Sequence, residues 1–537
     1  MSLASHVYTG IEYGIRAHAI QLPRVFRLAD PGLYPGDLFV DSLEQYCSYF
    51  WVAVAGCSHW IGPLPLLMAT HLLSRFLLIA AIFELTARWF PARPVRYIAL
   101  AACALRLRAI LAGEVLFAAL PTHTTFAFAL IAWGLLLAWR GRAIVAALLL
   151  AAACNCNVMI GLPAAMIVAV GYLAAHWRLD NLPRTLIAGV IWLAATAPVL
   201  RWAWRAPTSG DPVGHARQIC EIFWYHLDPL AWTAPVYLAL VGLLVCLTIG
   251  IIYKSRSTFD RSLTATLVVI VITWIGAVVA ARIDWFMPLL RLQLGRSATI
   301  AVILSLPLAA NAAWRAWQGR RFADIAAIAG LLIGFGLSHG RTGAAILLGL
   351  AVTAATLTDR SWLHTRRQRA ALIAVPIAAA VSLGLFIHAA VRKGRHEKYD
   401  GVIFRTQPAA WRDVQHWARQ NTPRDARFMA PTQQLGFRVG ARRTLWFGND
   451  LDAIFWRADL SDELIRRHEL AGRLGFHDLP MNKIDWALLR SVADDEGIDY
   501  IVVPPTLLES AEPVYVNEDW AVARIRPSSG AESRPTS

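Results

Sequence analysis

The residues best suited to chemistry in this sequence are four acids in one short stretch, residues 29–44 (ADPGLYPGDLFVDSLE). Asp30, Asp37, Asp41 and Glu44 alternate with Pro and Gly residues, which form turns and prevent a long helix. A carboxylate held on a rigid turn can accept a proton from a substrate, so the stretch is a candidate for acid–base chemistry. Asp-Pro and Gly-Asp are also common surface-turn dipeptides, and an ordinary turn is the alternative interpretation.

The three aspartates of this acidic loop differ in their local sequence. Asp37 follows a Pro-Gly pair, where a tight turn is expected to present its side chain towards a membrane cavity, so Asp37 is the leading candidate for a base. Asp30 precedes a proline and is expected to fix the turn through its own backbone. Asp41 and Glu44 lie where a helix is expected to begin, and acids there also stabilise the helix dipole. Asp30 and Asp41 follow Asp37 as candidates.

Two arginines are candidates for binding an anion. Arg291 and Arg296, in the segment RLQLGRS, directly precede a predicted helix, and a helix N-terminus with a guanidinium favours phosphate. The alternative is an arginine at the membrane interface that pairs with lipid headgroups. His226 and Asp228 (WYHLDP) form a weaker candidate pair, because a helix cap explains Asp228.

The elements that must position these residues are mostly apolar helices. The 537 residues are 57% hydrophobic and only 16% charged, which indicates a polytopic membrane protein. The net charge of +15 does not indicate a nucleic-acid partner, because the arginines are concentrated in short loops between apolar segments. Of the seven cysteines, four lie in or beside apolar helices, so no disulfide framework is predicted.

Apolar segments of near-membrane length predict about twelve spans between residues 63 and 391. The expected ranges are 63–88, 95–112, 122–139, 142–158, 158–175, 184–201, 230–253, 262–281, 297–314, 321–338, 341–358 and 370–391. One alternating set of loops holds about twice as many Lys and Arg as the other, which makes that set cytoplasmic. The acidic loop and the tail after residue 391 are then extracytoplasmic. This topology needs an outer N-terminus, so either residues 42–62 hide a span or relatives carry a first helix that this chain lacks; we favour the second.

The composition changes near residue 392, which predicts a separate domain. We expect a helix over 411–420, buried strands at 427–431 and 500–505, and a terminal hairpin over 514–525. The predicted organisation is an acidic loop with an interfacial helix (1–62), a transmembrane helical domain (63–391), a periplasmic α/β domain (392–526) and a disordered tail (527–537).

Several short motifs together resemble the GT-C class of integral-membrane glycosyltransferases, in the form common in uncharacterised bacterial members. These motifs are DPGLYPGD, GEVLF before the third span, LQLGR before a later one, and WRDVQHWARQNTPRDARFMAP with GFRVGARR in the tail. The resemblance implies a bacterial inner-membrane enzyme that takes a sugar from a polyprenyl-phosphate carrier, on the extracytoplasmic face, and passes it to a glycan or lipid acceptor.

By that resemblance Asp37 is the general base and Arg296, with Arg291, binds the carrier phosphate. Glu114 or His123 would orient the acceptor or hold a divalent cation such as Mg or Mn. The alternative for Glu114 is an ion pair with a nearby arginine of the same helix. A single displacement would make this hexosyltransferase inverting.

Two other classes of protein share these features. A transporter or flippase of lipid-linked sugars would need the outer arginine sites but no catalytic base. Weak internal repeats in the sequence would favour a transporter, and none are seen. A non-catalytic relative would use its tail to bind a partner.

Overall fold

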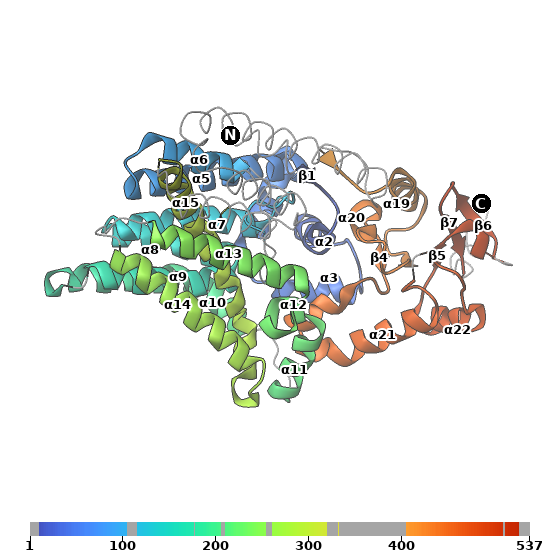
Figure 1. Cartoon of the computed structure of the whole chain (residues 1–537). Helices are drawn as coiled ribbons and strands as arrows, with labels where there is room; N and C mark the ends of the chain where they lie inside the picture. The colour runs from blue at the N-terminus through green and yellow to red at the C-terminus, as the bar shows by residue number, and fades with distance from the viewer. Residues whose placement is uncertain are drawn as a thin grey trace, which may run out of the picture. The chain divides into compact units, whose positions relative to one another are not determined.

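A computed structural model gives the arrangement of the chain in two compact units (Figure 1). The first comprises Met1–Ile11, Met68–Arg201 and Asp211–His396, and the second comprises Glu12–Leu67, Trp202–Gly210 and Glu397–Ser537. The structure describes residues 10–104, 115–176, 178–205, 210–253, 260–318, 331, 404–478, 480–508 and 511–525.

Long apolar helices build the first unit. Among the described residues, five helices are long and apolar enough to cross a membrane, and three shorter ones are also apolar. The helices are α5 (Pro63–Trp89), α6 (Arg93–Ala104), α7 (His123–Trp139), α8 (Ala143–Cys156), α9 (Val158–His176), α10 (Leu182–Trp204), α13 (Ala234–Ile252), α14 (Asp260–Ala280) and α15 (Ala298–Gln318). They correspond to nine of the twelve expected spans; 321–338, 341–358 and 370–391 lie outside the described residues except for residue 331. The chain is therefore a multi-pass α-helical membrane protein, as predicted.

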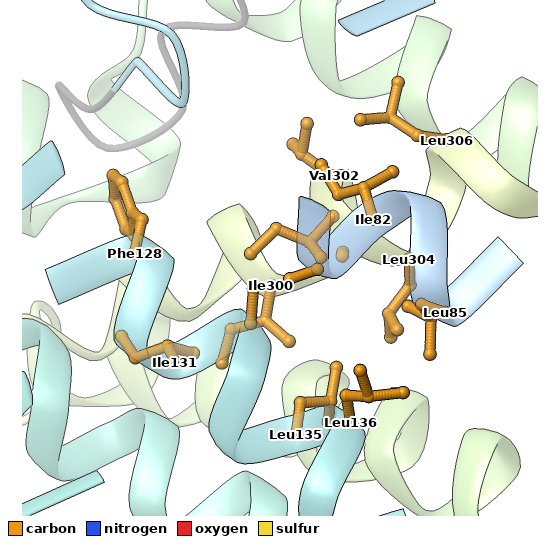
Figure 2. Close-up of a cluster of buried hydrophobic side chains, with 14 of the residues drawn as sticks. Ile82, Leu85, Phe128, Ile131, Leu135, Leu136, Ile300, Val302, Leu304 and Leu306 are labelled. Atoms are coloured by element: carbon orange, nitrogen blue, oxygen red, sulfur yellow. The ribbon is translucent and has the colours of Figure 1, made fainter. Parts of the chain in front are cut away.

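The core of this unit forms where the helices pack on one another. Figure 2 shows Ile, Leu, Val and Phe side chains of α5, α7 and α15 meeting in one cluster. Helix α7 packs on α8 and α9, and α15 packs on α6 and α13. Leu304 and Leu135 are fully buried there, and such close packing holds the polar ends of the helices in fixed positions.

Shorter elements connect these helices. They are η2 (Leu179–Asn181), α11 (Pro212–Ile222), α12 (Trp224–Leu227), η3 (Pro229–Ala231), η4 (Asp284–Leu292) and η5 (Leu294–Ser297). Two of them carry the predicted arginines, because Arg291 lies in the last turn of η4 and Arg296 lies in η5, just before α15 begins.

The second unit is built around a five-stranded sheet of order β4-β3-β5-β7-β6. Strands β3, β4 and β5 are parallel, and β7 pairs antiparallel with β5 and β6. The strands are β3 (Arg427–Met429), β4 (Thr444–Leu445), β5 (Tyr500–Val503), β6 (Pro513–Val516) and β7 (Ala521–Arg524). The helices are α19 (Ala409–Asn421), α20 (Phe437–Ala441), α21 (Ser461–Arg473) and α22 (Trp486–Glu496), with the 3-10 helices η6 (Asp450–Phe455), η7 (Ala458–Leu460) and η8 (Pro505–Leu507). The predicted small α/β fold is confirmed, including the helix, both buried strands and the hairpin.

The N-terminal segment of the chain belongs to this same unit. It contributes β1 (Ile11–Glu12), which pairs with β2 (Phe404–Arg405), and the helical elements α2 (Ala17–Ala29), α3 (Leu38–Ser42), η1 (Leu43–Gln45) and α4 (Tyr49–Ile61). Helix α4 has 13 residues, fewer than the roughly 20 that a membrane span needs. The acidic loop and the tail, which we expected in separate domains, therefore contribute to one compact body.

Candidate active site

Asp37, the leading candidate of the acidic loop, is the N-cap of α3 and is only 1% exposed. One carboxylate oxygen accepts from the backbone N–H of Val40 at 3.1 Å. The other accepts from the Arg438 Nε at 2.7 Å and from the N–H of Leu445 at 3.0 Å. The expected exposed position of Asp37 is not observed, because capping and a buried ion pair both draw the side chain inward.

Arg438 connects the acidic loop with a second acidic segment in the tail. Besides Asp37, its guanidinium donates to both carboxylate oxygens of Asp450, at 2.7 and 2.8 Å, and to the carbonyl of Leu445 at 3.1 Å. Burial opposes the charge of this arginine, but the carboxylates of Asp37 and Asp450 raise its pKa above the ordinary value. Asp37, Arg438 and Asp450 thus form a buried network of two carboxylates and one guanidinium.

Asp452 lies two residues after Asp450 in the sequence, and its surroundings differ from those of Asp37 and Asp450. It lies in η6, keeps partial contact with solvent, and has no hydrogen bond from any residue that the structure describes. Burial and the neighbouring charge of Asp450 raise the pKa of Asp452 from 3.8 to about 7. Because Arg438 neutralises only one of its two carboxylates, the site disfavours a further negative charge. Asp452 therefore exchanges a proton near neutral pH while Asp450 stays bound to arginine.

The other two aspartates of the loop have different surroundings. The carboxylate of Asp30 accepts from the N–H of Gly32 at 3.2 Å, which confirms its expected role in the turn, and it pairs with Arg424 at the surface. Asp41 lies 3.3 Å from Arg27. Burial raises the pKa of Asp41, and Arg27 acts in the opposite direction.

In the helical body, Arg296 and His226 lie together although 70 residues separate them in sequence. The Arg296 Nη2 is 3.3 Å from the His226 Nδ1. The Tyr225 ring packs against the same imidazole, with ring centroids 4.3 Å apart and the planes tilted by 44°. Asp228 caps η3 through the N–H of Leu230, as expected, and pairs with Arg282 at 2.8 Å. A guanidinium beside an imidazole is suited to a phosphate group.

The remaining candidates of the body have structural contacts or lie outside the described residues. His123 is buried at the start of α7, where its Nε2 is 3.1 Å from the Asn157 Nδ2, and the same amide donates to Thr124. Arg291 lies half-buried in η4. Glu114 falls outside the described residues. In the described part of the chain, no group of three or more His, Cys, Asp or Glu side chains is placed to hold a metal ion.

Fold and side chains together define a multi-pass helical membrane protein with an α/β unit that carries a buried charge network. A family described as a domain of unknown function (DUF6798) matches residues 409–448, a segment that includes Arg438. No curated protein matches the chain. Among solved structures, ArnT from Cupriavidus metallidurans in the apo state is similar over 98% of this chain and 96% of that one, with 14% identity and a TM-score of 0.47.

Arg438, Asp450 and Asp452 were not among the residues selected from the sequence. The sequence signal for the two acids is the segment GNDLD, in which Asp450 and Asp452 lie two residues apart and follow turn-forming Gly and Asn. No local signal marks Arg438 as the partner of Asp37, because the two are 401 positions apart in the sequence.

Proposed function

We propose that the chain is a membrane glycosyltransferase that moves a sugar from a polyprenyl-phosphate carrier to a hydroxyl acceptor on the extracytoplasmic face. The observation that carries the proposal is the unequal pair Asp450 and Asp452: one carboxylate is fixed by Arg438 and the other holds its proton until about neutral pH. A carboxyl group whose pKa is raised to near the working pH is typical of acid–base catalysis. A transporter or flippase has no need of such a group.

We assign the role of each aspartate from the number of hydrogen bonds that its carboxylate already accepts. Asp37 is occupied by Arg438 and two backbone N–H groups, so we assign it to holding the loop in place. Asp452 has no such donors among the described residues and has a pKa near the working pH, which is the optimum for a general base. We assign proton acceptance to Asp452, with Asp41 as the second choice and Asp37 as the anchor.

The chemical step is a single displacement. The acceptor oxygen attacks the anomeric carbon while the hydroxyl proton passes to Asp452. The bond from that carbon to the phosphate oxygen breaks, and its electron pair leaves with the phosphate. Separately from this step, Arg296, beside His226 in the helical unit, is assigned to bind the carrier phosphate. The products are an inverted glycoside and the free polyprenyl phosphate.

The test uses membranes containing the full-length protein and polyprenyl phosphates that carry radiolabelled hexoses. Asp452→Asn should lower the rate at which label leaves the carrier by about 100- to 10,000-fold and remove the inflection of the pH–rate profile near pH 7. Asp413→Asn, an exposed aspartate on α19, is the matched control and should retain full activity.

Two further variants separate the roles of the other residues. Arg296→Lys retains the charge but loses the guanidinium fork, so carrier binding should weaken, and Arg296→Ala should weaken it more. Full activity of Asp452→Asn together with loss in Asp41→Asn would move the base to Asp41. If both variants, and Asp37→Asn as well, transfer sugar at the normal rate, the glycosyltransferase proposal fails.

A further inference from the structure

The short element η4 of the first unit has two apolar faces, one buried and one exposed. In a 3-10 helix, residues three positions apart lie on the same face. Ile283, which is the N-cap of η4, Phe286 and Leu289 form one such row, and all three side chains are exposed. Met287 and Leu290 form another row, and both are buried. The buried row attaches η4 to the protein, and the exposed one, here called the apolar row, is left open.

Trp285 lies next to the apolar row in sequence and is 85% exposed. Large apolar side chains that are exposed together mark a surface that another molecule covers. Tryptophan is enriched at membrane interfaces, because the body of its ring is apolar and its N–H can reach water. The composition of this surface is therefore that of a segment lying at the edge of a bilayer.

The apolar row adjoins the lipid-facing side of a membrane span. Helix α14 is long and apolar enough to cross a membrane, and only 33% of its most apolar stretch is buried inside the protein. Its exposed Val268, Ile272 and Ile275 recur at helical spacing, so they form one side that lipid covers. The N–H of Ile283 donates to the carbonyl of Val279 in the last turn of α14 at 2.9 Å. The apolar row thus begins where the span ends, at the boundary between acyl chains and headgroups.

The charged groups that border the apolar row are paired with one another. Arg282, directly before the row, lies 2.8 Å from Asp228. Asp284, directly after Ile283, lies 3.0 Å from Arg217 of α11. Both arginines are about half exposed, and long side chains of this kind place their charge among headgroups while their stems lie along apolar surface. An apolar face bordered by charges is the arrangement of segments that lie in the membrane interface.

We propose that η4 inserts the apolar row and Trp285 into the bilayer at that end of α14, with lipid as the partner. The inserted side chains contact the upper parts of the acyl chains, and the ion pairs of Arg217 and Arg282 stay among the headgroups. Lipid is the partner because the row continues the lipid-facing side of a span of the same unit. The inference does not depend on the proposed sugar transfer, because it concerns only the position of η4 in the membrane.

The test measures the depth of single nitroxide labels on the full-length protein in phosphatidylcholine nanodiscs. The labels are attached through Trp285→Cys or Leu289→Cys, and parent protein treated in the same way corrects for labelling of the natural cysteines. Power saturation compares collisions with oxygen, which concentrates in the bilayer, with collisions with Ni-EDDA, which stays in water. Val271→Cys on the exposed side of α14 is the lipid reference, and Glu221→Cys, exposed on α11, is the water reference.

The labels of Trp285→Cys and Leu289→Cys should collide more with oxygen than with Ni-EDDA, as in Val271→Cys, whereas Glu221→Cys should show the reverse. Ratios equal to that of Glu221→Cys would refute insertion. Low accessibility to both reagents would mean that protein covers the row, and it would refute lipid as the partner. Thermal unfolding of each labelled variant is measured alongside, and Phe286→Cys replaces any variant that unfolds below the parent.

Discussion

Asp452→Asn should make the protein more stable above neutral pH even though it removes the proposed base. The pKa of this carboxyl is about 7 in the folded protein, against an ordinary value of 3.8. The folded state therefore binds the proton more tightly than the unfolded state does. Stability that is fully present below pH 3.8 is lost as the pH rises from there to about 7. Asparagine carries no charge at any pH, so the variant does not suffer this loss.

The size of the effect follows from the difference between the two pKa values. A difference of about 3 units corresponds to ~4 kcal/mol at 1.4 kcal/mol per unit. Because Asp452 keeps partial contact with solvent, we expect about 2–4 kcal/mol. The advantage of the variant should be absent near pH 4, grow through the interval from about pH 4 to pH 7, and remain constant above it.

The assay is the thermal unfolding midpoint of the full-length protein in detergent, followed by tryptophan fluorescence between about pH 4 and pH 9. Asp413→Asn, which removes an exposed carboxylate, controls for the general effect of charge. An Asp452→Asn variant that shows the same midpoint as the parent at every pH would refute the placement of this side chain. A stabilisation that is largest at low pH would refute the sign of the argument. Stability gained together with activity lost would be expected of a catalytic group and not of a structural one.

Three further predictions concern the fold. Arg438→Met should destabilise the protein by about 3–5 kcal/mol, because it leaves two buried carboxylates without a neutralising cation, and adding Asp37→Asn and Asp450→Asn should restore part of that loss in chemical denaturation. Gly436→Ala should reduce the yield of folded protein, measured by size-exclusion chromatography, since the residue has φ +87° and a Cβ would lie 2.6 Å from the carbonyl oxygen of Gly14. A phosphatase reporter fused at residue 400 should be active only outside the cytoplasm, as the distribution of arginines in the loops predicts; cytoplasmic activity would reverse the topology.

The sequence predicts those parts of the structure that short-range chemistry determines. Apolar length places the helices of the body, and alternation with turn residues places the strands of the tail. The turn role of Asp30 and the capping role of Asp228 also follow, because each side chain bonds to a backbone N–H two residues away. Contacts of this kind require only the local chain.

The local sequence does not determine the position of the Asp37 side chain. Its local sequence, a tight turn before a short helix, is compatible with either an exposed or a buried carboxylate. The choice is made by Arg438, a residue of α20 that reaches the loop only when the tail has folded. A single buried cation thereby converts the most prominent acid of the loop into an anchor.

The same cation determines which acid is left to react. Arg438 has one positive charge and binds Asp37 and Asp450, so the network retains a net negative charge when both are ionised. Asp452, two residues after Asp450, lies next to this negative charge. Burial and the charge of Asp450 together raise the pKa of Asp452 to about 7. The proposed base is therefore a consequence of the anchor, and the two can be recognised only when the acidic loop and the tail are considered as one folded body.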